Sequence, residues 1–509
     1  MSSSRNLFAH QIRITSFAEK RAYTYLSCET GTGKSLIVIE LLEKWGMRAI
    51  WVTMNQCTGV VCDEFAKWGS PLRAVRLEGS KKQRQQIIAS GNWDILVVNY
   101  EATRGLAEEL KDCEVNVIIF DESQRIKNRR SAQSQACRKI ALSIKKRAQM
   151  ESMLTGRKQC GHIIVMTGTP ITKNILDLWS QTDVLCPTDS IKDFKQHVLG
   201  FGSYTSYEKS VAIVTPHPRL GYRAKIYEFP DDRTRMVTEQ MAKFSQMAMK
   251  VDCLDLPPQL FKEVRIDMLP PQAHIYAALR NDMIAAIDDV PVPMYSRAVL
   301  DTFGIVPLKH EDLLDKRGFV SADMAVTLQT RLQQVTSGFV KTDDGREVNI
   351  ASCKIDMLRE MLPNLTETIG DHKVVIWARF TRDVDNIMAL CNEMGLNPVR
   401  LDGRTSHDAH NIVTLFQSRP GVRVLVGNIQ LGVGITLTAA DYCVFYSHSF
   451  NGEHRMQALD RIHRIGQTRA VTYYDFEARA SVDGKIISSN REKTGFAVRT
   501  LNDLKKLLG

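Results

Sequence analysis

The chain has 509 residues, and its 67 Lys and Arg against 57 Asp and Glu give a formal net charge of +10. This length exceeds the roughly 100–200 residues of a typical domain, and 44% hydrophobic residues are ordinary for a globular protein. No apolar run reaches the roughly 18 residues of a membrane span, and the first residues lack the apolar segment of a secretory signal. Eleven scattered cysteines without a CxxC pair favour reduced thiols in a cytosolic or nuclear compartment.

The excess positive charge is concentrated in one segment. Residues 123–162 contain eleven Lys or Arg and a single acid, Glu151, so this basic window carries +10 and the remaining residues sum to zero. A basic segment on a neutral body is typical of a polyanion-binding surface. A solvated helix face would explain the charge equally well.

Two series of short β-branched runs alternate with helical patterns, as in parallel α/β sheets. The expected strands are 47–54, 94–98, 115–120 and 162–166 in the first series, and 373–377, 397–401, 423–427, 441–446 and 471–475 in the second. Between the two series, about residues 236–350, the pattern is mostly helical and is interrupted by paired prolines. The sequence therefore predicts an α/β fold of two parallel-sheet lobes with a helical insertion between them.

The first chemical motif is a glycine-rich turn, CETGTGKS, that follows an apolar stretch and opens a helix. Gly31 and Gly33 let the backbone turn tightly and direct N–H groups at phosphate oxygens, while Lys34 would reach the β- and γ-phosphates. The Ser35 hydroxyl would hold Mg²⁺, and the helix adds its positive N-terminal end. The candidate nucleotide-binding residues are Thr30, Gly31, Thr32, Gly33, Lys34 and Ser35. An ordinary glycine-rich strand-to-helix turn is the alternative.

The second motif is an acidic pair at the end of an apolar strand, in VIIFDESQRIKN. Asp121 and Glu122 follow Phe120 at the carboxyl end of the strand, where ligands bind in open α/β sheets. Asp121 suits the Mg²⁺ shell, and Glu122 suits orienting or deprotonating an attacking water. A surface turn is the alternative for this pair alone, but together with GTGKS it predicts a nucleoside triphosphatase.

The third motif is HRMQALDRIHRIGQ in the second half. Interpreted as one helix, it places Gln457, Arg461 and Arg464 on one face, with Met456, Leu459 and Ile462 on the opposite, packed face. Arginines held on a packed helix suit a transition state rich in negative charge, where such a group contributes about 10³–10⁵ in rate. An amphipathic helix with an ordinary polar face is the alternative.

In this order, the motifs resemble those of the superfamily 2 helicase-like motor ATPases, specifically the Swi/Snf-type branch of DNA translocases. The first half contributes LFAHQ (7–11), GTGKS, WVTM, VVNYE (97–101), DESQRIKN and MTGTP (166–170). The second half contributes KVVIWARFTRDVD, RLDGRT (400–405), NIQLGVGITLTAAD (428–441), QALDRIHRIGQ and SVDGKI (481–486). The resemblance covers nearly the whole chain, and the RIHRIGQ ending is its most branch-specific feature.

The resemblance implies two RecA-like P-loop lobes, with ATP and Mg²⁺ as cofactors and DNA as the partner. It divides the chain into an ATP-binding lobe (1–275), a helical protrusion and linker (276–350) and a C-terminal helicase lobe (351–509). Gln11 would read adenine, and Gln124, Thr167 and Thr169 would couple hydrolysis to movement. The residues expected to contact nucleic acid are Asn99, Tyr100, Arg404, Gly434 and Thr436, to which the basic window adds Lys145, Lys146 and Arg147.

Four departures from the family pattern stand out. Cys28 occupies the first glycine position of the phosphate loop, and Gln124 replaces a histidine that is usual in this branch. The segment 450–452 reads Phe-Asn-Gly where the family often has Trp-Asn-Pro. The segment between DESQRIKN and MTGTP is longer than expected and contains most of the basic window. Without an obvious accessory domain, the chain resembles compact bacterial or phage-encoded members, which would place it in the cytoplasm, or in the nucleus if the source is eukaryotic.

The sequence thus predicts a DNA-dependent ATPase that moves along duplex DNA and remodels protein–DNA complexes or branched DNA, and that is a monomer in the absence of ligands. One alternative is a helicase that separates or anneals strands on forked DNA or RNA. An alternative of another class is a non-motor module that binds nucleic acid in an ATP-switched or inhibitory manner. The intact acidic pair and both arginines favour the motor.

Overall fold

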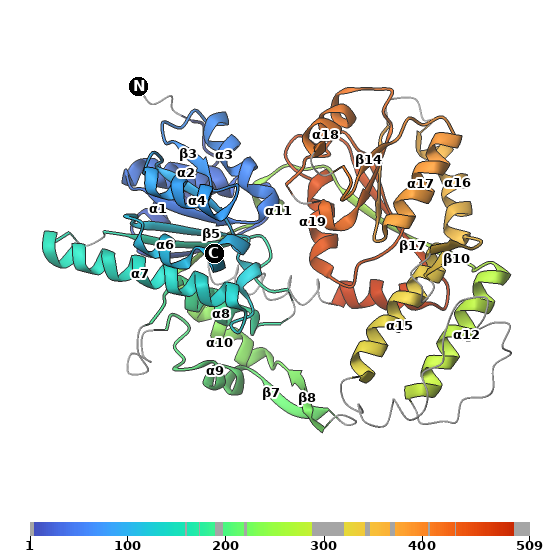
Figure 1. Cartoon of the computed structure of the whole chain (residues 1–509), viewed down its shortest axis with the longest axis horizontal. Coiled ribbons are helices and arrows are strands. Elements are labelled where there is room, and N and C mark those ends of the chain that lie inside the picture. The colour runs from blue at the N-terminus through green and yellow to red at the C-terminus, as the bar shows by residue number, and fades with distance from the viewer. Residues whose placement is uncertain are drawn as a thin grey trace. The chain divides into compact units, whose positions relative to one another are not determined.

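The computed structural model describes residues 5–157, 160–172, 174–188, 197–217, 221–287, 320–341, 347–366, 372–405, 408–432 and 434–492. The described chain divides into two compact units, which we call the first lobe (through Asp255) and the second lobe (Leu256–Glu492), as Figure 1 shows by colour. The sequence-based division at residue 275 differs from this boundary. Within the described residues, no helix has the length and apolar character needed to cross a membrane.

The first lobe contains a seven-stranded parallel sheet in the order β3-β4-β2-β5-β6-β1-β9. Its strands are β1 (Tyr23–Cys28), β2 (Ala49–Thr53), β3 (Ala74–Arg76), β4 (Ile95–Asn99), β5 (Val117–Asp121), β6 (His162–Thr167) and β9 (Ser245–Ala248). The central strands β2, β4 and β5 are apolar up to their last residue because helices cover both faces of the sheet, and each ends in a polar residue. An antiparallel hairpin, β7 (Ile213–His217) with β8 (Gly221–Glu228), lies outside this sheet.

Two apolar layers hold the helices against the two faces of this sheet. One layer packs α1 (Ala9–Glu19), α2 (Lys34–Trp45) and α3 (Thr58–Lys67). The other packs α5 (Tyr100–Gly105), α6 (Ala107–Asp112), α7 (Ala132–Thr155), α8 (Asp177–Leu185), α9 (Tyr204–Val211) and α10 (Asp231–Ala242). The short helices α4 (Lys81–Ser90) and α11 (Lys250–Cys253) complete the lobe.

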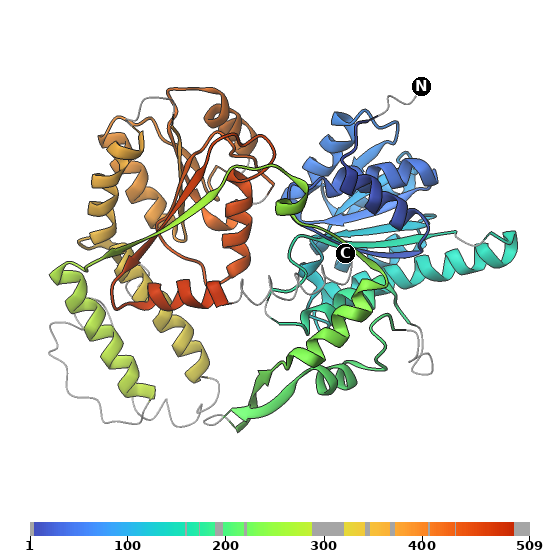
Figure 2. The same ribbon diagram turned by 180° about the vertical axis from the view of Figure 1, so that it is seen from behind.

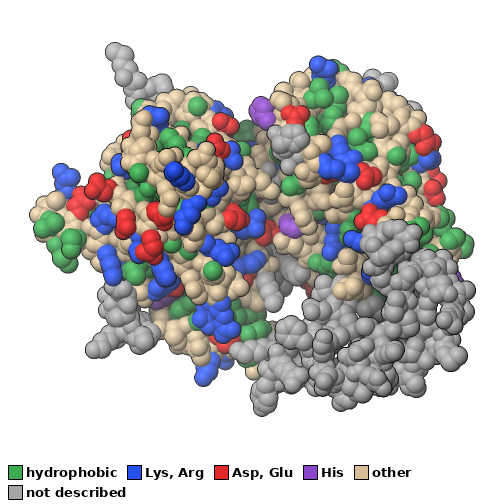
Figure 3. Space-filling model, viewed as in Figure 1, with side chains coloured by type: hydrophobic (Ala, Val, Ile, Leu, Met, Phe, Trp, Pro, Cys, Tyr) green, Lys and Arg blue, Asp and Glu red, His purple; other side chains and the backbone are tan. Residues whose placement is uncertain are grey.

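Helix α7 is the longest described helix of the first lobe, and its C-terminal part extends beyond the sheet (Figure 1). Its buried residues lie in the N-terminal part of the helix, from Ser134 to Ile144. Near its end, Met150, Met153 and Leu154 are exposed, and apolar side chains are visible at that tip in Figure 3. The basic window therefore begins after β5 and continues along this helix.

The second lobe contains a six-stranded parallel sheet in the order β10-β17-β16-β13-β15-β14. Its strands are β10 (Gln259–Ile266), β13 (Val374–Ala378), β14 (Val399–Leu401), β15 (Val424–Asn428), β16 (Tyr442–Phe445) and β17 (Val471–Ala478). Its helices are α12 (Pro270–Ile287), α15 (Val320–Ser337), α16 (Cys353–Thr366), α17 (Thr381–Glu393), α18 (Ala409–Ser418) and α19 (Gly452–Ile462). A small antiparallel pair, β11 (Phe339–Lys341) and β12 (Glu347–Asn349), follows α15.

The structure confirms all nine strands predicted from the sequence and the two parallel-sheet lobes. The prediction of a mostly helical segment over 236–350 is wrong at β9, at β10 and at the short pair β11 and β12, while residues 288–319 and 342–346 lie outside the described chain. Strand β9 is only four residues long, and β10 is an edge strand with Leu260 and Phe261 about half exposed. Neither strand shows the continuous β-branched run of a central strand, which is why the sequence pattern missed them. Figure 2 shows β10 running beside β17.

A buried ion pair joins the helices of the second lobe to the SVDGKI segment. The Lys354 Nζ lies 2.7 Å from Asp483 Oδ2, and both side chains are fully buried. Asp483 also accepts hydrogen bonds from Thr336 Oγ1 and the Ala478 backbone N–H, while Lys354 donates to the Tyr446 carbonyl. The carboxylate therefore links α15, α16 and the end of β17.

Replacing Lys354 with Met should destabilise the second lobe by about 3–5 kcal/mol, because Asp483 would keep a buried charge without its partner. Arg359→Met is the matched control, since the Arg359–Glu393 pair is exposed to solvent and its removal should leave the stability nearly unchanged. Urea denaturation of each variant measures the free energy of unfolding. Equal destabilisation of the two variants would contradict this account of the buried pair.

Candidate active site

The glycine-rich turn connects β1 to α2 in the first lobe. Gly31 and Gly33 have φ angles of 89° and 84°, a left-handed backbone conformation that glycine adopts without steric cost. Helix α2 begins at Lys34, which is buried and whose Nζ donates a 2.8 Å hydrogen bond to the Cys28 carbonyl. Thr32 closes the turn through a hydrogen bond from its Oγ1 to the Glu29 carbonyl. These hydrogen bonds define the shape of the loop, at a helix N-terminus suited to anions.

Cys28 occupies the position where the phosphate-loop pattern has glycine. It is the last residue of β1, is fully buried and pairs with Ala248 of β9. Burial raises the pKa of its thiol to about 12, so the side chain is a neutral packing group. An extended residue inside a sheet needs no glycine, which explains why the substitution fits the loop.

Helix α1 supports the glycine-rich turn from outside. The His10 Nε2 and the Gln11 Nε2 both hydrogen-bond the Thr32 carbonyl, at 2.8 Å and 3.3 Å. A Cβ on Gly33 would lie 2.1 Å from the Gln11 Nε2, so only glycine permits this contact. The sequence analysis did not predict His10 as a site residue, although its position next to Gln11 in LFAHQ could have indicated it. That Gln11 reads adenine stays a prediction.

The acidic pair follows β5 as predicted from the sequence. The Thr53 Oγ1 at the end of β2 donates to Asp121 Oδ2 at 3.0 Å, and Glu122 adopts a left-handed φ of 52°, which is uncommon for a residue with a side chain. Burial, followed by the nearby Glu122 charge, raises the pKa of Asp121 to about 7. A cation beside these carboxylates would act in the opposite direction and favour their ionised forms.

A chain of hydrogen bonds connects the acidic pair to the MTGTP segment. Gln124 donates from Nε2 to Glu122 Oε2 at 2.8 Å and accepts from Thr167 Oγ1 at 2.6 Å. The Thr167 Oγ1 in turn accepts from the Thr169 backbone N–H at 2.9 Å. Because an amide carries both a donor and an acceptor, Gln124 joins the two motifs in a single protonation state.

In the second lobe, the structure corrects the predicted helix of the RIHRIGQ motif. Helix α19 ends at Ile462, so Arg464 lies beyond the helix and not on a shared face with Gln457 and Arg461. The buried positions of α19 are Ala458, Arg461 and Ile462, whereas the predicted packing residues Met456 and Leu459 are only half-buried. Ile462 is thus buried as predicted, and the half-buried Leu459 packs against the same apolar cluster, whereas the burial of Arg461 was not predicted.

The two arginines of this motif differ in their surroundings. Arg461 is 5% exposed, and within the described chain its Nε has no hydrogen-bond partner. Arg464 donates from Nη1 to the Ile435 carbonyl at 3.4 Å, which brings it to the NIQLGVGITLTAAD segment. Gln457 donates to Glu453 Oε1 at 3.2 Å. The Nε of Arg461 is thus a buried donor that a ligand could satisfy.

Gln467, the last residue of RIHRIGQ, is a positioning residue that the sequence analysis missed. Its side chain is 5% exposed, and its Nε2 donates to the carbonyls of Thr438, Ala440 and Ile462. Its Oε1 accepts from the backbone N–H groups of Thr468 and Arg469. One side chain thus ties the NIQLGVGITLTAAD segment to the end of α19. Its place as the polar last residue of RIHRIGQ could have indicated this role.

The residues predicted to contact nucleic acid make contacts within their own lobes. Asn99 caps α5 through the Ala102 N–H, and the fully buried Tyr100 donates from its hydroxyl to the Asp121 carbonyl. Arg404 is half-exposed and pairs with Asp385 and Asp402. Gly434 has a φ of 80°, and Thr436 is half-buried. Their contact with nucleic acid stays a prediction.

The structure assigns part of the basic window to fastening α7. Lys145 donates to the Pro187 carbonyl at 2.9 Å, and Arg147 donates to the carbonyls of Val115 and Lys111, each at 2.8 Å. Arg138 pairs with Asp183 at 2.8 Å. Lys146 is exposed, and Lys158 lies outside the described residues. Two of the three DNA-contacting charges predicted from the basic window, Lys145 and Arg147, therefore have structural partners inside the first lobe.

Comparison with known proteins identifies the family. The SNF2-related domain matches residues 24–292, which is more than half of the chain. The chain belongs to the SNF2-related family. The helicase conserved C-terminal domain also matches residues 353–466. Both matches agree with the resemblance predicted from the motifs.

Curated relatives of the SNF2-related chain come from several organisms. It is 25% identical over 482 residues to the human "Lymphoid-specific helicase", covering 83% of this chain and 53% of the relative. It is 22% identical to "Uncharacterized ATP-dependent helicase MG018" of Mycoplasma genitalium, over 86% of this chain and 36% of the relative. With the yeast (Saccharomyces cerevisiae) "Transcription regulatory protein SNF2", identity is 24% over 92% of this chain and 26% of the relative. The chain thus spans about half or less of the length of these relatives.

Among solved structures, the "Sulfolobus solfataricus SWI2/SNF2 ATPase core in complex with dsDNA" aligns with 99% of this chain and 96% of that chain. The sequence identity is 20% and the TM-score is 0.40.

Replacing Gln467 with Ala should destabilise the second lobe, because each buried carbonyl left without a donor costs about 1–3 kcal/mol. Gln430→Ala is the matched control, since Gln430 is exposed and should change the free energy of unfolding by no more than about 0.5 kcal/mol. Thermal melting of the two variants compares them directly. Equal melting temperatures for Gln467→Ala and wild type would contradict the positioning role.

Proposed function

We propose that this protein is a DNA-dependent ATPase that couples ATP hydrolysis to movement along duplex DNA, and so remodels protein–DNA complexes or branched DNA. The observation that carries the proposal is the hydrogen-bond chain from Glu122 through Gln124 to Thr167, in a protein of the SNF2-related family. Relatives named as helicases and as a transcription regulatory protein support the motor and the DNA substrate.

ATP binds at the turn between β1 and α2. The backbone N–H groups of Thr30–Gly33 hold the phosphates, and Lys34 exchanges its hydrogen bond with the Cys28 carbonyl for the β- and γ-phosphates. The Ser35 hydroxyl and the Asp121 carboxylate are hard oxygen donors of the kind that Mg²⁺ prefers. When bound there, Mg²⁺ would neutralise charge on the β- and γ-phosphate oxygens.

Glu122 orients the attacking water and accepts its proton. The hydrogen bond from Gln124 fixes the Glu122 carboxylate, and the same amide accepts from Thr167. A displacement of Thr167 or Thr169 therefore changes the position of the catalytic carboxylate through one side chain. Arg461 and Arg464 of the second lobe supply positive charge to the transition state, and Gln457 assists them.

Contacts to DNA go to phosphates and sugars, which position the protein without reading sequence. We assign this role to Asn99, Tyr100, Arg404, Gly434 and Thr436, with Lys145, Lys146 and Arg147 from the basic window. Tyr100 is buried and its hydroxyl donates to the Asp121 carbonyl. A DNA strand bound at VVNYE would therefore influence the position of the acidic pair through this hydrogen bond. Such a contact would make ATP hydrolysis sensitive to DNA. We place the protein in the cytoplasm, or in the nucleus of a eukaryotic source.

Duplex DNA should stimulate ATP turnover, and Lys34→Ala should abolish turnover while leaving DNA binding measurable, because the substitution disables the phosphate loop and leaves the DNA surface intact. Steady-state ATPase assays with duplex, forked and single-stranded DNA and with RNA measure this. Absence of stimulation by any nucleic acid would refute the motor function and favour a non-motor binding module. A strand-displacement assay distinguishes translocation from unwinding, since a translocase removes proteins or triplex strands without opening the duplex.

Gln124→Leu should lower DNA-stimulated turnover by about 10–100-fold, because hydrogen bonds to a charged group contribute about 1.5–3 kcal/mol. Thr167→Ser is the control that keeps the hydroxyl and should retain most of the activity. The two variants are compared by ATPase rate at saturating DNA, alongside DNA affinity. If Gln124→Leu bound DNA more weakly and kept its turnover, the link between the two motifs would not serve hydrolysis.

A further inference from the structure

The first lobe contains a polar pocket of about 610 Å³ that no part of the ATPase mechanism uses. Three segments of the lobe form it: residues 127–130 after the acidic pair, residues 174–177 at the start of α8, and α9 with β8. The first segment begins three positions after Gln124, the last residue of DESQ, and the second begins four positions after Pro170, the last residue of MTGTP. Two of the three segments that line the pocket therefore follow, in sequence, the two motifs that Gln124 joins. Its volume lies within the usual range for ligand sites.

The acidic side chains of the pocket already have partners in the lobe. Asp177 accepts a hydrogen bond from the Thr172 backbone N–H at 2.9 Å, and Glu208 accepts one from the Tyr227 hydroxyl at 2.9 Å. Lys127 donates to the Thr172 hydroxyl. These contacts hold both carboxylates in place in the wall of the pocket.

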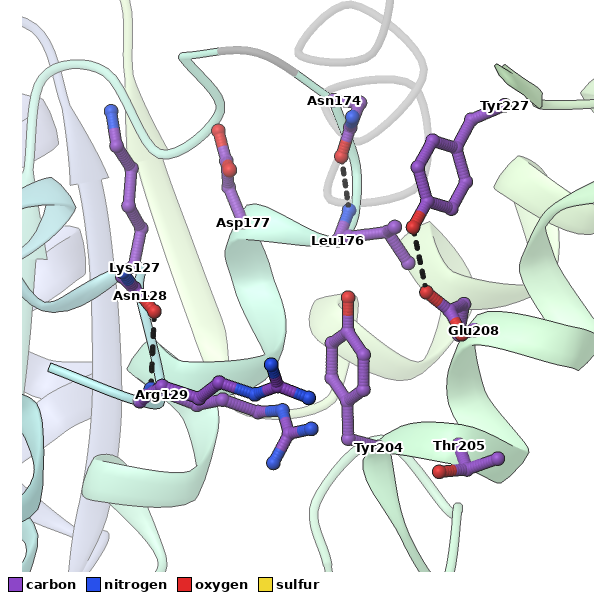
Figure 4. Close-up of a pocket in the computed structure, with 11 residues that line it drawn as sticks. Lys127, Asn128, Arg129, Asn174, Leu176, Asp177, Tyr204, Thr205, Glu208 and Tyr227 are labelled. Atoms are coloured by element: carbon purple, nitrogen blue, oxygen red, sulfur yellow. Dashed lines mark hydrogen bonds between the residues drawn. The ribbon is translucent and has the colours of Figure 1, made fainter. Parts of the chain in front are cut away.

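The arginines of the pocket are in a different situation. Within the described chain, no ion pair is formed by Arg129 or Arg130, and both residues are exposed. The Arg129 guanidinium carbon lies 4.3 Å from the centroid of the Tyr204 ring, and Figure 4 shows its guanidinium extending toward that ring. A guanidinium placed over an aromatic ring keeps its N–H groups available for a phosphate, and binds phosphate in a bidentate manner.

The combination indicates one class of ligand. Positive groups that track a phosphate backbone, next to an aromatic ring that packs against a nucleotide, are the common elements of sites for nucleic-acid strands. A phosphate alone, or the carboxylates of an acidic peptide, would use the arginines without requiring Tyr204. The half-buried Tyr204 is held by an edge-on contact with Trp179 and is thus a fixed platform.

We propose that this pocket is a second nucleic-acid contact of the first lobe, in which Arg129 and Arg130 hold a backbone phosphate and Tyr204 packs against the adjoining nucleotide. The proposal rests on DNA being the substrate of the motor. It adds the N-terminal end of the basic window to the assigned DNA contacts, because Lys145 and Arg147 also fasten α7. A ligand in the pocket would contact residues 127–130 and 174–177, the segments that follow the acidic pair and MTGTP in the chain.

The test is DNA binding by the full chain as a function of salt. Arg129→Gln and Arg130→Gln should each weaken binding of a labelled duplex and lower the slope of log affinity against log salt by about 0.9 for each phosphate that is no longer neutralised. Arg157→Gln is the matched control, because it removes the same charge from an exposed position of the same window outside the pocket, and its slope should equal that of wild type. Unchanged melting temperatures verify that the variants are folded.

A second pair of variants tests the aromatic platform. Tyr204→Leu should weaken binding of single-stranded DNA by about fivefold or more, since it removes the stacking of a base on the aromatic ring, whereas Tyr204→Phe should bind like wild type. If Tyr204→Leu and the arginine variants act only on single strands, the ligand is a displaced strand. If the arginine variants act equally on duplex DNA, the ligand is the duplex backbone. Both outcomes support the pocket as a nucleic-acid contact.

Two outcomes would overturn the proposal. One is a wild-type salt slope in both arginine variants for duplex and for single-stranded DNA alike, while duplex DNA still stimulates ATP turnover, which would leave the proposed function intact. The other is binding of free AMP that Arg129→Gln abolishes while DNA binding is unchanged, which would assign the pocket to a free nucleotide. If no nucleic acid stimulates the wild-type ATPase, the proposed function fails first, so the two failures are distinguishable.

Discussion

The parallel direction of the strands in the first lobe is the constraint on which the rest of the site depends. The carboxyl ends of β1, β2, β4, β5 and β6 all lie on the same side of the sheet, because every crossover connection returns the chain to the side where the strands begin. The register places Asp121 beside Met166 and Ser27 beside Thr167, so motifs far apart in sequence begin as neighbours. The hydrogen bonds among their side chains follow from this arrangement.

Each lobe joins two of its motifs through a buried glutamine. Gln124 bridges Glu122 and Thr167, and Gln467 bridges the segment around Thr438 and Ala440 to the end of α19. A buried amide that satisfies both its donor and its acceptor fixes geometry strongly, since breaking either hydrogen bond leaves an unsatisfied polar group. Each glutamine therefore fixes the position of one motif relative to the other within its lobe.

The sequence was informative where a local pattern decides the structure. The central strands are apolar runs buried on both faces, so β2, β5 and β13 could be predicted from composition alone, and the glycine-rich turn and acidic pair follow from residue type and spacing. The order of the motifs along the chain identified the family, and the resemblance to that family implied the two RecA-like lobes and the DNA partner.

Long-range contacts were not predictable in this way. Gln467 owes its role to carbonyls nearly 30 positions away, and Arg147 owes its role to carbonyls more than 30 positions away. The position of Arg464 depends on where α19 ends, and helix ends are the least reliable part of a pattern-based prediction. The edge strand β10 lacks the apolar run of a central strand, because one of its sides has no neighbouring strand.

The placement of β10 has a practical consequence for work on the second lobe in isolation. This strand precedes α12, yet it pairs with β17 along eight residues, from Gln259 with Val471 to Ile266 with Ala478. The preceding Pro257 carbonyl is held by His463 of the RIHRIGQ motif. A fragment that began at residue 353, where the helicase domain match starts, would leave β17 as a bare sheet edge, which is a template for intermolecular pairing and aggregation.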